Sequence, residues 1–445
     1  MRIFHKRPFP GGVHPTDGKD KALSAGKEIR PFRPGQVWIS MEQTPGGRCE
    51  PLVREGDRVR RGQKIGEPQT FTASAVHASI SGAVTGLRTA KGTLYCAIRG
   101  DEEQPSPLGR SALEPVDAAA FGREEIIAAI REGGLVGMGG AGFPAAVKYE
   151  TKAEIDTLLL NGAECEPFLT CDDRLMTEQP LAVLNGAMLL KKAAGAGRAV
   201  LCLEDNKPEA ARALEEALRL FEDPPELKIL PTRYPQGGER QLIQAVTGRE
   251  VPAGGLPADA GVIVSNVATA RTAAAILMDR EPLTSRVVTV TGGVREPQNF
   301  LAPIGASLQE LIAAAGGVNS RENRVILGGP MTGRCIARNY DGETEIGFVT
   351  KTTSGIVVLP PARLTESPCI RCGGCVSVCP AGLTPWKIDF AERAGDGALC
   401  ERLDADACIG CGCCSYICPA RRELARHTIL ARDRVRAMQR ERRNA

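Results

Sequence analysis

The chain has 445 residues, enough for roughly three or four domains of ordinary size. Hydrophobic residues make up 42% of it and charged residues 24%, a globular composition that excludes a disordered chain. No apolar run approaches the roughly 18 residues of a membrane span, and the first residues, MRIFHKRPFPGG, predict no secretory signal. A net charge of only +3 excludes a globally basic nucleic-acid binder.

The first predicted elements are an N-terminal arm and a strand-rich segment. Residues 1–30 are polar and rich in glycine and lysine, which is typical of an extended arm. Residues 31–105 contain short apolar runs separated by glycine turn signals, which predict strands. Their pattern V-x-x-G-D-x-V-x-x-G-Q-x-I-G resembles the barrel-sandwich hybrid of biotinyl and lipoyl carriers. Phe71–Ser74 contains no lysine where those carriers display one, so a carrier function is not expected.

The segment at 120–285 follows an acidic, proline-bearing linker and is predicted to be an α/β domain. Helices are expected at 123–132, 181–193 and 207–221, and strands at 155–160, 199–203 and 227–230. Strands that alternate with helices favour a mostly parallel sheet.

A glycine loop and an acidic turn are the candidate ligand-binding features of this segment. The loop at 137–142 contains G-x-G-x-x-G, which alone is weak evidence because no clear strand precedes it. A helix starting near Phe143 would add free N–H groups for a phosphate, and Lys148 would add a positive charge. The strand at 155–160 leads into NGAECEP, which places Asn161 and two carboxylates where ligands usually bind in α/β sheets. The alternatives are a flexible loop and a solvated acidic turn.

Residues 286–345 have a different pattern. RVVTVTGGV is predicted to be a strand and a turn, SLQELIAAAGGV a helix closed by two glycines, and RVILGGPMTG a further strand. Together they predict a compact β–α–β unit.

Cysteines are the anomalous part of the composition, because ten of the sixteen lie between Cys369 and Cys418, within a module predicted at 360–420. Eight of these ten form two runs of the pattern C-x₂-C-x₂-C-x₃-C-P, typical of bacterial ferredoxins with two [4Fe–4S] clusters, and Cys400 and Cys413 fall outside the pattern. In that pattern the fourth cysteine of each run ligates the other cluster. One cluster is therefore predicted to use Cys369, Cys372, Cys375 and Cys418, and the other Cys408, Cys411, Cys414 and Cys379. A pair of zinc sites is the alternative, although zinc motifs usually separate two C-x-x-C pairs.

The last segment, 421–445, is predicted to be a basic helix. It contains nine arginines and three acidic residues, a local charge of +6. Its imperfect apolar stripe consists of Leu424, Ile429, Leu430, Val435 and Met438. Such a helix would bind a membrane or an acidic partner. The alternative is a solvated helix that packs on the cysteine module.

Two stretches of the α/β segment, GLVGMGGAGFPAAVK and NGAECEPFLTCDDR, resemble the flavin- and NADH-binding subunit of respiratory complex I, and shorter matches follow at 238–239 and 265–267. FPGGVHP at 9–15, the strand-rich segment that precedes the glycine loop and the two cysteine runs resemble RnfC, the NADH-facing subunit of the Rnf ferredoxin:NAD oxidoreductase. This resemblance covers nearly the whole chain. It implies a multidomain α/β fold with a barrel-sandwich hybrid, a Rossmann-like FMN/NADH domain, a β-grasp (SLBB) domain and a two-cluster ferredoxin-like module.

The resemblance also implies FMN, NAD(H) and two [4Fe–4S] clusters as cofactors. The implied FMN-binding residues are Gly137, Gly139, Gly140, Gly142, Lys148, Asn161, Glu239 and Asn266. For NADH they are Phe143 and two candidate catalytic carboxylates, Glu164 and Glu166. The chain departs from the complex I pattern at Met138, Ala163, Arg240 and Ser265, which keeps the backbone cradle but changes individual side-chain contacts.

The implied function is that of a redox enzyme, a peripheral subunit at the cytoplasmic face of the cell membrane that moves electrons between NAD(H), FMN and the clusters. The implied partners are membrane-spanning and soluble subunits of the complex, with ferredoxin indirectly, and no nucleic acid. Two alternatives remain at this level. One is a cobalamin reductase of the microcompartment type, a family in which the barrel-sandwich segment is expected after the clusters. The other is a cluster-bearing scaffold without NADH activity.

Overall fold

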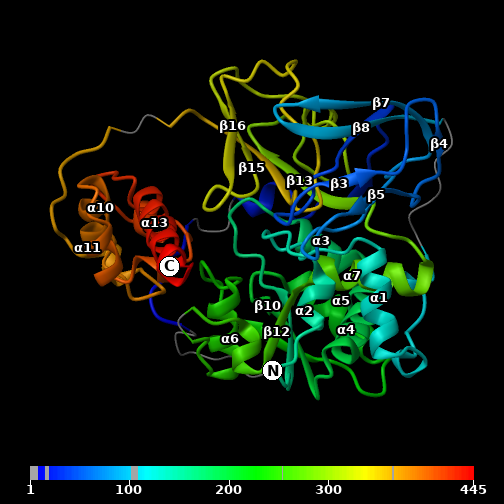
Figure 1. The fold of residues 1–445 in the computed structure, drawn as a ribbon, viewed down its shortest axis with the longest axis horizontal. Coiled ribbons are helices and arrows are strands. Elements are labelled where there is room, and N and C mark those ends of the chain that lie inside the picture. The colour runs from blue at the N-terminus through cyan, green and yellow to red at the C-terminus, as the bar shows by residue number, and fades with distance from the viewer. Residues whose placement is uncertain (1–8, 16–19, 102–108, 253, 363–364, 445) are drawn as a thin grey trace.

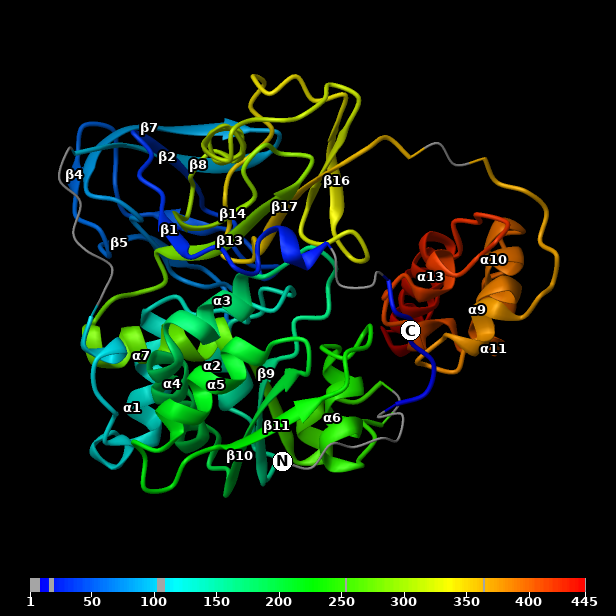
Figure 2. The ribbon, with the colours of Figure 1, turned by 180° about the vertical axis from the view of Figure 1, so that it is seen from behind.

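The computed structural model describes residues 9–15, 20–101, 109–252, 254–362 and 365–444. A strand-rich body lies beside an α/β domain, and a long extended segment joins the body to a separate helical module (Figure 1). Seen from behind, the N-terminal segment passes between the helical module and the α/β domain (Figure 2). The predicted multidomain α/β organisation is confirmed.

The barrel-sandwich hybrid consists of two small antiparallel sheets. One has the order β2-β8-β7-β4, with strands Gln36–Ser40, Thr93–Gly100, Gly82–Ala90 and Arg58–Val59. The other has the order β3-β5-β6, with strands Cys49–Pro51, Lys64–Pro68 and Val76–His77. Val37 and Ile39 are two residues apart on β2, so both point inward and are fully buried.

The α/β domain contains a parallel sheet of order β11-β10-β9-β12, as the alternation of strands and helices predicts. In chain order its strands are β9 (Thr157–Gly162), β10 (Arg198–Glu204), β11 (Glu226–Leu230) and β12 (Val262–Asn266). Its helices are α1 (Arg123–Glu132), α2 (Ala145–Tyr149), α3 (Cys171–Glu178), α4 (Pro180–Ala194), α5 (Pro208–Leu218), α6 (Glu239–Thr247) and α7 (Val267–Asp279). The helices α4 and α7 approach closely at Gly186, where a Cβ atom would lie 1.7 Å from the carbonyl oxygen of Ala270.

The six-stranded sheet of the third domain extends beyond the expected range of 286–345. Its order is β1-β14-β13-β17-β15-β16, and α8 (Leu308–Ala314) packs on it. The strands are Ile29–Pro31, Gln298–Pro303, Ser285–Gly292, Gly355–Leu359, Arg324–Leu327 and Arg334–Arg338. The predicted strands β13 and β15 are not neighbours, because β17 lies between them and pairs with both. The run GIVVL of β17 is almost entirely buried, so it is stable only with a partner on each side.

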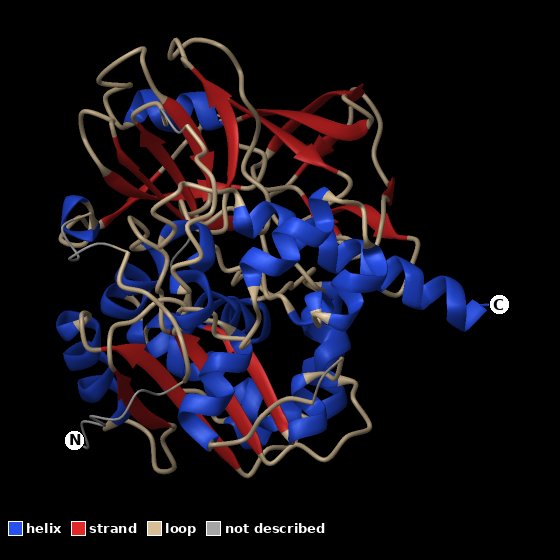
Figure 3. Cartoon of the chain, turned by 90° about the vertical axis from the view of Figure 1, so that its left-hand side faces the viewer, coloured by secondary structure: helices blue, strands red, loops and turns tan. Residues whose placement is uncertain are grey.

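The cysteine module contains short helices and one long one. They are α9 (Gly374–Ser377), α10 (Pro385–Arg393), α11 (Gly397–Arg402), α12 (Cys413–Tyr416) and α13 (Leu424–Asn444). Leu424, Ala431 and Val435 of α13 are buried, the last two in a core shared with α10 and α11. Two of the five residues of the apolar stripe, Leu424 and Val435, are therefore covered by the module, whereas Ile429 and Met438 are half-buried and Leu430 is exposed. The helix packs on the module as the alternative predicts but keeps part of its stripe open. The last turns of α13 extend beyond the other elements (Figure 3). Among the described residues, no helix has the length and apolar character needed to cross a bilayer.

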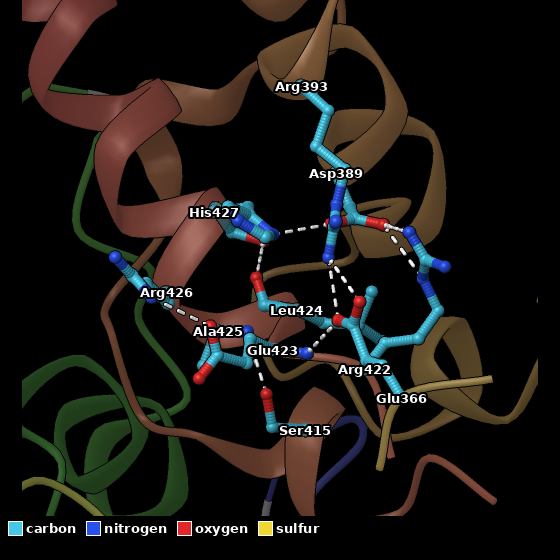
Figure 4. Close-up of polar contacts among 11 residues, drawn as sticks. Glu366, Asp389, Arg393, Ser415, Arg422, Glu423, Leu424, Ala425, Arg426 and His427 are labelled. Atoms are coloured by element: carbon cyan, nitrogen blue, oxygen red, sulfur yellow. Dashed lines mark hydrogen bonds and ion pairs between the residues drawn. The ribbon is translucent and has the colours of Figure 1, made fainter. Parts of the chain in front are cut away.

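A buried carboxylate fixes the start of α13 against α10. Asp389 is fully buried and accepts hydrogen bonds from Nε of Arg393 and of Arg422, each at 2.9 Å (Figure 4). Its other close partner is Nδ1 of His427, at 2.6 Å. Burial raises the pKa of Asp389, but the hydrogen bonds from the two arginines outweigh it and lower the pKa below its ordinary value. This network joins the segment after Cys418 to α10.

Candidate cofactor-binding sites

A large pocket lies at the carboxyl edge of the parallel sheet, with a volume of about 640 Å³. Asn161 is the last residue but one of β9 and Asn266 ends β12, and the register of these neighbouring strands places the two residues side by side. The Asn161 side chain donates to the carbonyl of Gly237 at 2.8 Å, and the Asn266 side chain donates to Asp172 at 2.7 Å. The predicted residues that line this pocket are Gly139, Gly140, Asn161, Glu164, Glu166, Glu239 and Asn266.

The glycine loop forms one wall of the pocket. It closes on itself, because the N–H of Gly137 donates to the carbonyl of Phe143 at 2.7 Å. Gly140 has φ of +133°, a conformation that other residues rarely adopt. No protein group within the described ranges accepts from the N–H groups of Gly139, Gly140 or Ala141. Unpartnered backbone N–H groups on a glycine loop fit a phosphate group.

Four of the predicted cofactor-binding residues do not line the pocket. They are Gly137, Gly142, Phe143 and Lys148. Gly137 and Gly142 instead shape the loop, since the N–H of Gly142 donates to the carbonyl of Gly137. The ammonium group of Lys148 lies 3.4 Å from Glu239, so it pairs with a carboxylate that does line the pocket.

The two candidate catalytic carboxylates are already hydrogen-bonded. Glu164 accepts from the backbone N–H groups of Asp172 and Asp173 at 3.1 and 3.3 Å, at the start of α3. Glu166 accepts from the backbone N–H groups of Met331 and Thr332 at 3.2 and 2.9 Å, so it anchors the β15–β16 loop to the pocket. Burial raises the pKa of Glu166 despite these hydrogen bonds.

The positions that depart from the complex I pattern have other partners. The Ser265 hydroxyl lies 2.9 Å from the Tyr149 hydroxyl. Arg240 donates to backbone carbonyls of the loop that follows α6, including that of Gly255 at 3.0 Å. Met138 is buried, and its backbone N–H donates to Thr269 at 2.9 Å. The residues at these three positions therefore contact protein groups around the pocket.

Three charged residues that sequence reasoning did not select, Asp172, Arg286 and Arg334, also line the pocket. Asp172 lies in the stretch NGAECEPFLTCDDR, whose resemblance to the complex I subunit could have indicated it. No sequence pattern indicated Arg286, because it lies in a predicted strand of another domain. Its buried guanidinium reaches from β13 and donates to the carbonyls of Met138 and Thr353, both at 3.2 Å. Burial and then the charge of Glu164 raise the pKa of Asp172 to about 7.

We expect Asp172→Asn to flatten the pH dependence of stability of the flavin-free protein. The folded state binds the Asp172 proton more tightly than the unfolded state, so this residue lowers stability as pH rises from about 4 to about 7. The variant is expected to gain up to about 4 kcal/mol above pH 7 and nothing at pH 4, measured by denaturant unfolding. Asp223→Asn is the control, since Asp223 is exposed and Lys191 lowers its pKa. Equal dependences of stability on pH for Asp172→Asn and the wild type would contradict the raised pKa of Asp172.

The cysteines of the two runs surround two separate cavities. Cys369, Cys372, Cys375 and Cys418 line one, which we name the outer cavity. Cys379, Cys408, Cys411 and Cys414 line the other, named the inner cavity, and Cys413 also contacts it. This grouping exchanges the fourth cysteine between the runs. The backbone N–H groups of Arg371 and Gly410, at equivalent positions of the runs, each point to a cysteine sulfur at 3.4 Å. Such N–H to sulfur contacts, and four cysteines of the repeated pattern around each cavity, fit [4Fe–4S] clusters.

The inner cavity adjoins the large pocket. Ile409 and Cys411 line both of them. The Tyr234 hydroxyl donates to the carbonyl of Cys411 at 2.7 Å, and Tyr234 is itself a pocket residue. No residue around the outer cavity belongs to the pocket, within the part of the chain that the structure describes. The inner cavity therefore faces the pocket and the outer cavity does not.

The segment FPGGVHP at 9–15 fastens the cysteine module to the α/β domain. The N–H of Gly12 donates to the carbonyl of Val378 at 2.9 Å, just before Cys379. Val13 and Tyr234 exchange two backbone hydrogen bonds at 2.8 and 2.9 Å. Hence this segment, which we name the strap, contacts the inner cavity's Cys379 loop on one side and a pocket residue on the other.

Four family models match the chain, and their order agrees with the fold. They are the RnfC barrel sandwich hybrid domain (7–95), the Nuo51 FMN-binding domain (130–275), the SLBB domain (287–334) and the 4Fe-4S dicluster domain (368–421). The NAD⁺-reducing [NiFe]-hydrogenase contains a chain of similar fold, with a TM-score of 0.50 and 21% identity over 75% of this chain and 67% of that one. Together the fold and the sites define an electron-transfer protein with FMN and two iron–sulfur clusters.

The curated relatives give the family, and each is the corresponding subunit of an ion-translocating complex. The relative from the ion-translocating oxidoreductase complex of Rhodobacter capsulatus is 38% identical over 87% of this chain and 75% of its own length. The relative from the Na⁺-translocating ferredoxin:NAD⁺ oxidoreductase complex of Acetobacterium woodii is 40% identical over 88% and 89%. The relative from the proton-translocating ferredoxin:NAD⁺ oxidoreductase complex of Clostridium ljungdahlii is 37% identical over 86% and 84%. This chain belongs to the RnfC family, whose members are subunits of ion-translocating oxidoreductase complexes.

Proposed function

We propose that this chain is the peripheral subunit through which a membrane-bound ferredoxin:NAD oxidoreductase exchanges electrons with NAD(H), at the cytoplasmic face of the membrane. The observation that carries the proposal is the pocket whose wall contains both the glycine loop and Cys411 of the inner cavity. A single site thus adjoins a phosphate cradle and a ferredoxin-type cysteine set. The names of the relatives, which are subunits of ion-translocating complexes, support the same function.

The pocket residues are suited to hold FMN. The N–H groups of Gly139 and Gly140 would bind its phosphate, and the amides of Asn161 and Asn266 would contact the ring edge. The pocket volume of about 640 Å³ lies in the usual range for ligand sites. Bound FMN would accept a hydride from NADH and release electrons singly, which connects a two-electron donor to one-electron clusters.

For NADH we propose the acidic side of the same pocket. Glu164 and Glu166 line it, and their carboxylates are held in place by backbone N–H groups of α3 and of the β15–β16 loop. Fixed carboxylates are suited to accept hydrogen bonds from ribose hydroxyls. Phe143, which the resemblance implies for NADH, stands at the end of the glycine loop.

The replacement Gly140→Leu tests this function. We expect the folded variant to retain almost no FMN after gel filtration and to lose NADH:ferricyanide activity, because leucine is strained at φ of +133° and its side chain would occupy the phosphate approach. Absorbance of the bound flavin and the activity are the measurements.

The matched control is Gly254→Leu, which is also strained, at φ of +71°, but lies outside the pocket. It is expected to keep normal FMN. Normal flavin content in folded Gly140→Leu would place the phosphate elsewhere. A wild-type chain that binds FMN and both clusters yet shows no NADH oxidation would favour the scaffold alternative.

A further inference from the structure

We propose that the surface around the outer cavity docks an acidic partner subunit of the same complex that carries a one-electron redox centre. This inference rests on the proposed function and deepens it, because it says where electrons pass between this chain and the rest of the complex. The docking surface is defined by Ile370, Arg371, Trp386, Lys387 and Phe390, together with Arg421.

The positions of the two cavities indicate that the outer one faces the partner subunit. The inner cavity shares Ile409 and Cys411 with the pocket, and the strap covers its Cys379 side. The outer cavity contacts neither the pocket nor the strap within the described residues, and its Cys372 is exposed. Among the two sets, the outer one is therefore the one open to another protein.

Large apolar side chains gather beside the outer cavity. Ile370 lines it and is 68% exposed. Phe390 is 47% exposed and packs edge to face on Trp386, a cavity residue, with 6.2 Å between ring centres. Of the twelve large exposed hydrophobic side chains in the described chain, six lie on the cysteine module. An exposed apolar cluster of this kind marks a protein interaction site.

The same surface carries uncompensated positive charge. Arg371, Lys387 and Arg421 are exposed, and none forms an ion pair with a carboxylate of the described residues. Two acidic side chains of the same module are occupied by other cations, because Glu366 pairs with Arg393 and Glu423 pairs with Arg426. Complementary charge orients a partner and disfavours wrong ones, so the partner's face is acidic.

The apolar component favours a resident subunit over a diffusing carrier. Transient electron-transfer contacts are small, whereas lasting interfaces bury more apolar surface. The pair Trp386–Phe390 and Ile370 would provide that apolar centre, and the three cations would form its rim.

The experiment uses the full chain loaded with FMN and clusters, added to membranes that contain the other subunits but lack this one. Lys387→Glu and Phe390→Gln are compared with Arg212→Glu and Leu220→Gln, which change exposed residues in and after α5. The measurements are the fraction bound to membranes at high salt, NADH-driven reduction of the membrane acceptors, and electron paramagnetic resonance of both clusters.

Each module variant is expected to keep both cluster spectra and to lose membrane binding by about fivefold or more, which corresponds to about 1 kcal/mol. The α5 variants are expected to bind as the wild type does. Unchanged binding of both module variants overturns the proposal. It is also overturned if binding is unchanged and only the reduction of an added soluble ferredoxin falls, because the surface would then serve a diffusing carrier. Membrane binding is measured without NADH oxidation. A chain that fails to oxidise NADH therefore still gives a separate result for the docking surface.

Discussion

Replacing Cys379 with serine is expected to destroy the cluster held by Cys408, Cys411 and Cys414 and to spare the other one. The reason is the grouping in the structure, where Cys379 lines the inner cavity although it belongs to the first run. Cys418→Ser is expected to do the reverse, because Cys418 lines the outer cavity. Each variant should keep about four of the eight iron atoms that two clusters contain.

The measurements are iron content and electron paramagnetic resonance of the reduced protein. Cys413→Ser is the matched control: Cys413 contacts the inner cavity but is not one of the pattern cysteines, and we expect both signals to remain. Alanine variants at Cys379 and Cys418 exclude ligation by the serine hydroxyl. If Cys379→Ser and Cys369→Ser abolish the same signal, each run closes its own cluster and the exchange is wrong.

Replacing Gly11 with valine is expected to detach the cysteine module from the α/β domain. Gly11 has φ of +67°, and a Cβ atom there would lie 2.7 Å from the backbone of Cys379 and Val378. Overpacking against backbone costs about 1–3 kcal/mol, and the left-handed conformation costs about 1–2 kcal/mol more. Together they would raise the undocked population by roughly 30-fold or more.

Detachment has direct physical readouts. Small-angle scattering should give a larger radius of gyration, and proteases should cleave the segment that connects β17 to the cysteine module faster than in the wild type. NADH-dependent cluster reduction should fall while FMN content and dithionite reduction stay normal. Gly26→Val is the control on the same N-terminal segment, since a Cβ atom there meets no other group within 4 Å. A compact Gly11→Val protein with normal cluster reduction would show that the strap does not hold the module.

Local patterns predicted much of this protein. The alternation of strands and helices between 120 and 285 predicted the parallel sheet, and the helix at 123–132 has the predicted bounds. The cysteine spacing predicts the ligands of each cluster, and the same two groups of thiols line the two cavities of the structure. Asn161 was expected near a strand end, because the end of an apolar run is visible in the sequence.

The tertiary structure decided what depends on segments far apart in the chain. The third sheet takes β1 from the N-terminal segment and β17 from beyond 345, because strand pairing depends on which edges meet in space and not on any local period. Arg286 reaches the pocket only because β13 packs against the α/β domain. The glycine pair at 11–12 has a role only beside Val378 and Cys379.

The C-terminal helix shows most clearly what the sequence alone did not decide. Its composition determined a basic, weakly amphipathic helix, but a membrane and a protein core are both apolar environments for the same stripe. Only the position of α10 and α11 showed that Ala431 and Val435 are buried in the module's own core. Sequence thus determined the elements and their chemistry, whereas tertiary packing decided which of their faces remain free for a partner.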